Sequence, residues 1–204
     1  MKKKKPIIAV DLDDVVVGSA QRIIGAYNET YGTNLDLSHM YAEEHGKVTW
    51  SAPDENTAIK RVYEILESDV FYKAEPTQHA ITALQKLKVR YELFAVTGRH
   101  GAMEEATRLW LEKHLPGVFT DVIFTNFYNA ETQTIKYKKV AKADICDELN
   151  ASILIEDLPR HAIDVAASGK RVLLFGDYPW NQLAELPPNM SRVADWDDVL
   201  KELM

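Results

Sequence analysis

Cysteine is almost missing from this chain, and long apolar runs are missing altogether. The single cysteine, Cys146, excludes an internal disulfide and favours a reducing compartment. No apolar run approaches the roughly 18 residues that a membrane-spanning helix needs. The lysine-rich start leads into PIIAV, which is too short for the hydrophobic region of a signal peptide. We therefore expect a cytoplasmic protein that does not bind membranes.

Positive charge is also scarce. The chain has 24 lysines and arginines against 31 acidic residues, which gives a net charge of −7. Binding to a nucleic acid polymer or to an anionic membrane needs a basic face, so neither partner is expected. The 204 residues, 46% of them hydrophobic, suffice for one substantial core and a small second lobe.

Apolar segments alternate with helical patterns over most of the chain. The expected strands are residues 6–13, 91–97, 120–126, 151–157 and 170–176. The expected helices are residues 18–31, 55–68, 75–90, 101–114, 139–149, 159–168 and 195–203. Several strands are apolar throughout, which is typical of a parallel sheet covered on both faces. The sequence therefore predicts an α/β fold with a Rossmann-like, doubly wound parallel sheet.

One interval breaks this alternation. About 80 residues separate the first two strands, although a crossover between parallel strands needs only a dozen or more. We therefore expect residues 17–75 to be an inserted helical cap, with 1–16 and 76–204 as the core domain. Ligands of open parallel sheets bind at the carboxyl ends of the strands, and the insertion begins there, so it would cover the site.

Polar side chains follow each of the first four expected strands. They are Asp11, Asp13 and Asp14, then Thr97, Gly98 and Arg99, then Thr125 and Asn126, and finally Glu156 and Asp157. Two lysines, Lys139 and Lys142, lie near the start of the helix before the fourth strand. Because the carboxyl ends of parallel strands meet at one edge of the sheet, these groups are expected to converge.

The acids at this edge predict a metal. Asp11 and Asp13 are two residues apart on a strand and face the same side, whereas Asp14 faces away. Two carboxylates about 4 Å apart repel by roughly 4 kcal/mol at an effective dielectric of about 20. The second pair, Glu156 and Asp157, increases this repulsion. Mg²⁺ would relieve it and keep positions open for phosphate oxygens, so the set predicts a phosphoryl-binding site with a carboxylate nucleophile.

The segments DLDDV, VTGR, a lysine at a helix start, and ILIED occur in the order typical of one superfamily. In this order they resemble the haloacid dehalogenase-like (HAD) superfamily, whose first motif is hhhDxDx[TV]. The insertion resembles a C1-type cap. The tail, with RVLLFGDYPWN and VADWDDVL, resembles the 5′(3′)-deoxyribonucleotidase group, the cytosolic type C 5′-nucleotidase family.

The resemblance implies a Mg²⁺-dependent phosphomonoester hydrolase that acts through an aspartyl-phosphate. It implies that Asp11 is the nucleophile and that Thr97 hydrogen-bonds the phosphoryl group. Asp13 would protonate the leaving alkoxide and later deprotonate water, while its main-chain carbonyl binds the metal.

Two further assignments carried by the resemblance stay open. A lysine should hold Asp11 and the phosphate in place, and Lys142 fits the commoner register while Lys139 lies one turn earlier. Asp157, with Glu156 beside it, should complete the Mg²⁺ site, and we favour Asp157 for direct contact with the metal.

The substrate-binding residues are open as well. Candidates are Gly98, Arg99, Tyr41, His45 and Trp50, but Arg99 could form a local salt bridge and the aromatic residues could belong to the core of the cap. The remaining polar and aromatic residues are expected to be structural. Among them, Asp14 is expected to be a turn or capping acid, Asn126 to lie in a loop, Trp180 and Trp196 to pack, and Cys146 to be buried and inert.

The favoured substrate class is (deoxy)nucleoside monophosphates, with small sugar or metabolite phosphates as the alternative. A receiver-like signalling domain needs only about 120 residues and no second acid pair, so length and Glu156–Asp157 argue against it. A dehalogenase would not need Asp13 to protonate a leaving group. A catalytically dead phosphate-binding protein would have lost one of these residues, and all of them are present.

Overall fold

The computed structural model describes residues 4–40, 50–66, 68–126 and 139–204. Its parallel sheet has the strand order β3-β2-β1-β4-β5-β6. The strands are β1 (Ile7–Val10), β2 (Glu92–Thr97), β3 (Asp121–Phe124), β4 (Ile153–Glu156), β5 (Arg171–Phe175) and β6 (Met190–Val193). The order reverses between β1 and β4, which confirms the doubly wound sheet. Ligands of such sheets bind in the crevice at this reversal, beyond the carboxyl ends of the strands.

The central strands owe their burial to sequences that are apolar along both faces. β1 (IIAV) and β4 (ILIE) are buried at every position, as expected for strands covered on both sides. β6 was not predicted from the sequence. Its sequence, MSRV, is polar at its centre, and it lies at the edge of the sheet, where β5 alone pairs with it.

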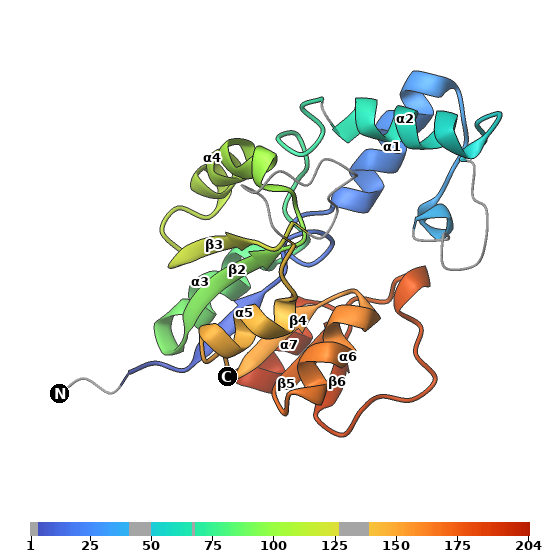
Figure 1. Cartoon of the computed structure of the whole chain (residues 1–204). Coiled ribbons are helices and arrows are strands. Elements are labelled where there is room, and N and C mark those ends of the chain that lie inside the picture. Colours follow the sequence, from blue (N-terminus) through green and yellow to red (C-terminus); the bar gives the residue numbers. More distant parts are fainter. Residues whose placement is uncertain (1–3, 41–49, 67, 127–138) are drawn as a thin grey trace.

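Helices cover both faces of the sheet (Figure 1). One face is covered by α3 (Ala80–Arg90), α4 (Glu104–His114) and α7 (Trp196–Leu203), and the other by α5 (Lys142–Glu148) and α6 (Pro159–Ala167). Trp110 and Trp196 are among the largest fully buried side chains of the first layer. Cys146 is fully buried in the second layer, as expected.

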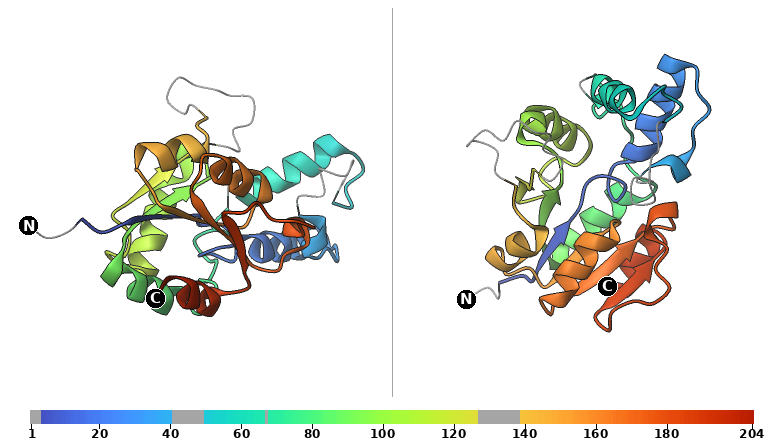
Figure 2. Two further views of the ribbon diagram at one scale, coloured as in Figure 1. Left: turned by 90° about the horizontal axis from the view of Figure 1, so that it is seen from below. Right: turned by 45° about the vertical axis from the view of Figure 1, so that its right-hand side comes forward.

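A helical lobe, described at residues 19–40, 50–66 and 68–71, lies beyond the carboxyl ends of the strands (Figures 1 and 2). In its described part it contains α1 (Ser19–Tyr31), the short helix η1 (Leu37–His39) and α2 (Glu55–Leu66). An apolar cluster of its own joins these elements through Ile23, Ile24, Tyr27, Leu35, Ile65 and Val70. The helical members recur every three or four residues along one face, which explains why α1 and α2 pack together.

The lobe is joined to the core by two segments that run side by side. Val17 forms an isolated antiparallel bridge with Pro76. The N–H of Thr77 donates to the carbonyl of Val16 at 2.9 Å. Both crossings therefore lie next to the turn that follows β1.

Most helix ends agree with the sequence, but two starts were wrong. The helix expected from residue 75 begins at Ala80, because His79 has a left-handed φ of 65° and the residues before it pair with the turn after β1. α5 begins at Lys142 rather than at 139. Asp195 caps α7 as expected, since its side chain accepts the N–H of Asp198 at 2.9 Å. Within the described ranges, no helix is both long enough and apolar enough to cross a membrane.

Candidate active site

Asp11 lies where β1 meets β4. β1 ends at Val10, and the N–H of Asp11 continues the pairing by donating to the carbonyl of Ile155 at 2.9 Å. Asp11 is only 4% exposed. Leu12 is buried in the core cluster, and Asp13 follows it at the start of a tight turn. The nucleophile candidate is thus fixed by the sheet itself, at the reversal of strand order.

Lys142, the first residue of α5, forms an ion pair with Asp11. Its Nζ is 2.8 Å from Oδ1 of Asp11 and donates to Oε2 of Glu156 at 2.6 Å. Burial would lower the pKa of Lys142, but the two carboxylates more than offset this and raise it above its ordinary value. Lys139, in contrast, is exposed and precedes the helix. The geometry favours Lys142 as the lysine of the site.

Glu156, the last residue of β4, binds protein groups through both of its oxygens. Besides Lys142 on Oε2, the N–H of Leu158 donates to Oε1 at 3.0 Å, and Nδ1 of His161 lies 3.7 Å from the same oxygen. Burial would raise the pKa of Glu156, but Lys142 and His161 outweigh it and hold the pKa at about 2. Glu156 is therefore a charged partner of the lysine.

Asp157 has a different partner. Its Oδ2 accepts the indole N–H of Trp180 at 2.7 Å. Burial, followed by the charges of Glu156 and Asp11, raises the pKa of Asp157 well above its usual range. From the sequence, Trp180 was expected to be a packing residue. The contact exists because β5 lies beside β4, a neighbour relation that the local sequence does not encode.

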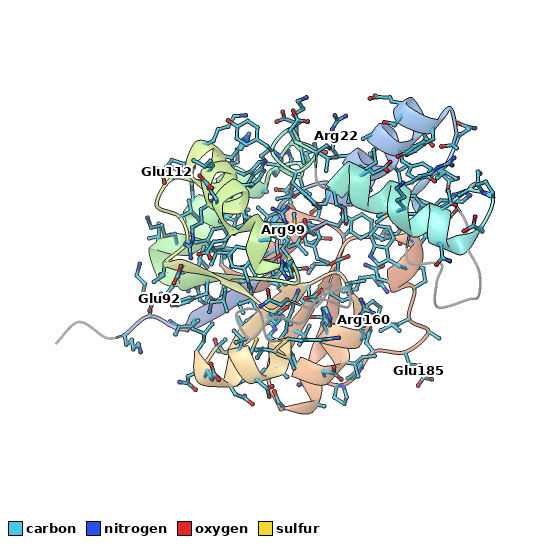
Figure 3. The ribbon with its side chains drawn as sticks, turned by 45° about the horizontal axis from the view of Figure 1, so that its top comes forward. Arg22, Glu92, Arg99, Glu112, Arg160 and Glu185 are labelled. Atoms are coloured by element: carbon cyan, nitrogen blue, oxygen red, sulfur yellow. The ribbon has the colours of Figure 1, made fainter. Side chains whose placement is uncertain are left out.

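Arg99, a substrate-binding candidate, instead binds Asp13. Its Nε donates to both carboxylate oxygens at 3.1 and 3.0 Å, and Nη2 donates to Oδ1 at 2.7 Å. Nη1 donates to the Thr107 hydroxyl at 3.0 Å, and the guanidinium lies 4.4 Å from the centre of the Phe71 ring. The Ser19 hydroxyl also donates to Asp13. Figure 3 shows Arg99 in the interior of the molecule, which agrees with an exposure of 4%. The local salt bridge is thus the arrangement found.

This environment keeps Asp13 ionised. Burial would raise its pKa, but the charge and hydrogen bonds of Arg99, together with Ser19, lower it below its ordinary value. Thr97 is fully buried beside it, and its hydroxyl donates to Oδ2 of Asp13 at 3.4 Å. Gly98 follows and is buried too.

Asp14 and Asn126 have structural contacts. Asp14 has a φ of 59° in the turn after β1, and its Oδ1 accepts the N–H of Ala20 in the first turn of α1 at 2.9 Å, which agrees with the turn or capping role expected. Burial, with the charge of Asp13 adding to it, raises the pKa of Asp14 to about 7. Oδ1 of Asn126 accepts the N–H of Gly101 at 2.7 Å and ties together the loops that follow β3 and β2.

Three acids form a compact cluster of oxygen donors. Ligand oxygens of Asp11, Glu156 and Asp157 lie within 4.8 Å of one another, and all three residues are buried. Lys142 supplies one positive charge against three carboxylates. Burial, followed by the charge of Glu156, raises the pKa of both Asp11 and Asp157 well above the usual range, so a bound cation would stabilise their ionised forms. All-oxygen donors are what Mg²⁺ prefers, and the cluster fits that ion.

The three substrate-binding candidates from the insertion either pack within the lobe or fall outside the described residues. Tyr41 and His45 fall in the undescribed segment. Trp50 packs against the lobe cluster and meets Tyr27 edge-on, with ring centres 5.1 Å apart. The structure therefore brings Trp50 into contact with the lobe core.

Comparison with known proteins decides the family. A model of the family described as 5′ nucleotidase, deoxy (pyrimidine), cytosolic type C protein matches residues 5–204. The chain belongs to this family. It is accordingly a phosphatase of the HAD-like superfamily, which confirms the resemblance seen in the four sequence segments.

Relatives of this nucleotidase-family chain include one curated protein and several solved structures. An uncharacterized 32.4 kDa protein of Enterobacteria phage T4, from the Gp30-rIII intergenic region, is 26% identical over 211 residues, which cover 98% of this chain and 70% of that protein. A HAD-like family hydrolase of Streptococcus pneumoniae superposes with a TM-score of 0.68 at 15% identity, covering all of both chains. YfnB of Bacillus subtilis, determined bound to magnesium, gives 0.64 at 12% identity over 98% of this chain and 99% of that one. At these identities the solved structures show the HAD fold.

Proposed function

We propose that this protein is a Mg²⁺-dependent 5′-nucleotidase that hydrolyses (deoxy)nucleoside monophosphates through an aspartyl-phosphate on Asp11. The observation that carries the proposal is the buried Asp11–Lys142 ion pair at the strand-order reversal, with Asp13 two residues away. The family match supports the nucleotide class of the substrate. Because the matching family is of the cytosolic type, we place this hydrolysis in the cytoplasm.

Asp11 would begin the reaction. A carboxylate oxygen attacks phosphorus, the bond from phosphorus to the leaving oxygen breaks, and the phosphoryl group is carried on Asp11. Lys142 holds Asp11 in place and offers positive charge to the phosphoryl oxygens. Bound Mg²⁺ would supply further neutralisation of these oxygens and of the clustered carboxylates.

Asp13 would then move the protons. It gives a proton to the leaving alkoxide, and in the second step it takes one from the water that attacks the phosphoaspartate. Arg99 holds Asp13 as a carboxylate in the ligand-free protein, which suits the second step. A negatively charged phosphoryl group beside Asp13 opposes the effect of Arg99 and favours the protonated form needed in the first step.

The test is a substrate panel with purified protein. Nucleoside 5′- and 3′-monophosphates, deoxynucleotides and sugar phosphates are assayed for phosphate release with Mg²⁺ and with EDTA. We expect hydrolysis only with Mg²⁺ and the highest kcat/KM for nucleoside monophosphates. Preference for a sugar phosphate would leave the phosphatase chemistry intact and overturn the nucleotidase assignment, whereas equal rates in EDTA would overturn the metal dependence.

A further inference from the structure

The loop that follows β5 reaches across to the acid cluster. Trp180 lies in η4 (Pro179–Asn181), and its indole N–H is 2.7 Å from Oδ2 of Asp157. Trp180 is half-buried, and η4 lies against η1 of the helical lobe. A side chain outside the four superfamily segments therefore binds one of the proposed metal ligands.

Neighbouring side chains fix the position of this indole. The ring of Tyr178 stacks on Trp180 with centres 4.6 Å apart and planes 5° from parallel. The Tyr178 hydroxyl donates to the carbonyl of Asp14 at 2.7 Å, which anchors the stacked pair to the turn after β1. Asn181 is fully buried and donates to the carbonyl of Phe175, so the other end of the loop is anchored to β5.

Gly176 makes this packing feasible. It has a φ of 84°, and a Cβ at this position would lie 2.2 Å from the Tyr178 ring. A side chain larger than hydrogen would displace the ring that supports Trp180. The loop is thus built to bring one N–H to one carboxylate oxygen.

We propose that Trp180 is a positioning residue for Mg²⁺, which orients Asp157 by holding Oδ2 and directing Oδ1 toward the metal. This inference rests on the metal site of the proposed function and adds a residue to it. The neighbouring Glu156 is held by Lys142 and Leu158, whereas Asp157 depends on Trp180 for its orientation. Groups that hydrogen-bond to a metal ligand commonly change metal affinity by about 10–100-fold when removed.

The experiment compares two tryptophan-to-phenylalanine variants of the full chain by calorimetric titration with Mg²⁺. Trp180→Phe keeps a ring for stacking and loses the N–H. Trp110→Phe is the matched control, because Trp110 also donates at 2.7 Å, but to the carbonyl of Ala74. We expect Trp180→Phe to weaken Mg²⁺ binding by about 10-fold. Trp110→Phe should lower Tm and leave the Mg²⁺ Kd unchanged.

Tryptophan fluorescence gives a second readout that does not depend on turnover. Mg²⁺ changes the charge next to the Trp180 indole, so wild type and Trp110→Phe should show a Mg²⁺-dependent change in emission, and Trp180→Phe should lose most of it. If Trp180→Phe fails to fold, Tyr178→Leu removes the supporting ring and should also weaken Mg²⁺ binding.

The outcomes separate the two claims. A wild-type protein that does not bind Mg²⁺ would overturn the metal site of the proposed function. A wild-type protein that binds Mg²⁺, with unchanged Kd in Trp180→Phe, or in Tyr178→Leu where that variant replaces it, would overturn the positioning role alone. Equal weakening by Trp110→Phe would reassign the effect to general destabilisation.

Discussion

The acid-rich edge of the sheet and the helical lobe differ in what holds their side chains. At the sheet edge, Asp11, Glu156 and Asp157 are almost fully buried, and each is bound by a side chain from another element. In the lobe, Tyr27 and Trp50 pack on each other through ring contacts. The edge is a polar network in which each member orients the next, whereas the lobe is a small apolar core.

This difference predicts different consequences of mutation. An isosteric substitution in this network removes a reacting or orienting group while it keeps the shape and much of the hydrogen bonding of the side chain, so activity should fall more than stability. Removing the Trp50 ring, which packs on the lobe cluster, should leave the network intact and cost packing energy instead. Substitutions in the two regions should therefore separate activity from stability.

The largest effect is expected from Asp11→Asn. The amide keeps the shape of the side chain but cannot attack phosphorus, so kcat should fall to background while Tm is retained. Enzymatic acceleration of monoester hydrolysis reaches up to about 10²¹-fold, so spontaneous reaction cannot mask the loss. Phosphate release and a melting curve measure both quantities. A variant with a substantial share of wild-type kcat would exclude the aspartyl-phosphate.

Asp13→Asn should slow alkyl phosphates more than activated aryl phosphates, whose leaving groups need little protonation. The loss for alkyl substrates should be about 10²–10⁴-fold, the usual range for general acid catalysis. Arg99→Lys should give a smaller loss with the same substrate dependence, because lysine keeps the charge but lacks the planar fork. Equal slowing of both substrate types would show that Asp13 is not the acid.

Mg²⁺ should raise Tm, because a ligand that binds only the folded state adds about 2.7 kcal/mol at 100 times its Kd. Asp157→Ala should remove most of this gain. Asp121→Ala is the control, because it removes an exposed acid at the start of β3 whose partner is Arg108 of α4. Differential scanning fluorimetry measures the Tm of wild type and of both variants with Mg²⁺ and with EDTA. If Asp157→Ala kept the full Mg²⁺ response, the acid cluster would not be the metal site.

Trp50→Ala tests the other side of the comparison. Because Trp50 packs against the lobe cluster, we expect Tm to fall by a few degrees and kcat for a small aryl phosphate to stay unchanged. The KM for nucleotides, measured on the same samples, tests the sequence-based prediction that this ring also contacts the base. Loss of aryl phosphate hydrolysis in a folded variant would mean that the two regions are not independent.

The smallest effect concerns pH. The pKa of Asp14 is about 7 in the folded protein, above its unfolded value near 4. A raised pKa contributes stability at low pH that is lost as pH rises through about 7. In EDTA, Asp14→Asn should therefore flatten the fall in Tm between about pH 4 and 7. The asparagine oxygen still accepts the N–H of Ala20. An unchanged pH profile would exclude Asp14 as the titrating group.

Much of the fold follows from local sequence. Five of the six strands and the double winding were predicted from the alternation of apolar segments and helical patterns. β6 was not predicted, because an edge strand with a polar centre lacks the apolar run by which a strand is recognised in the sequence. The late start of α3 was not predicted, because it follows from the pairing of Pro76 with Val17, a tertiary contact that the local sequence does not encode.

The candidate site also has a part that the sequence predicts and a part that it does not. The convergence of Asp11, Lys142 and Asp157 follows from strand ends meeting at one edge. The side chains that bind these acids could not be predicted in this way, because each such contact depends on which strands and loops are neighbours in the fold. Trp180 on Asp157 was assigned a packing role for this reason, and for Arg99 the sequence left the local salt bridge open without identifying Asp13 as its partner.

The bridge between Val17 and Pro76 makes the molecule modular. The lobe leaves and re-enters the core at one point, and the two ends are already paired there. A short turn could replace the whole lobe without altering the register of β1 with β2 or β4. Because the entropy of closing a loop grows only slowly with its length, lobes of other sizes fit the same junction. Grafting at this junction would exchange the lobe, provided that the graft keeps the contacts that Ser19 and Phe71 make with Asp13 and Arg99.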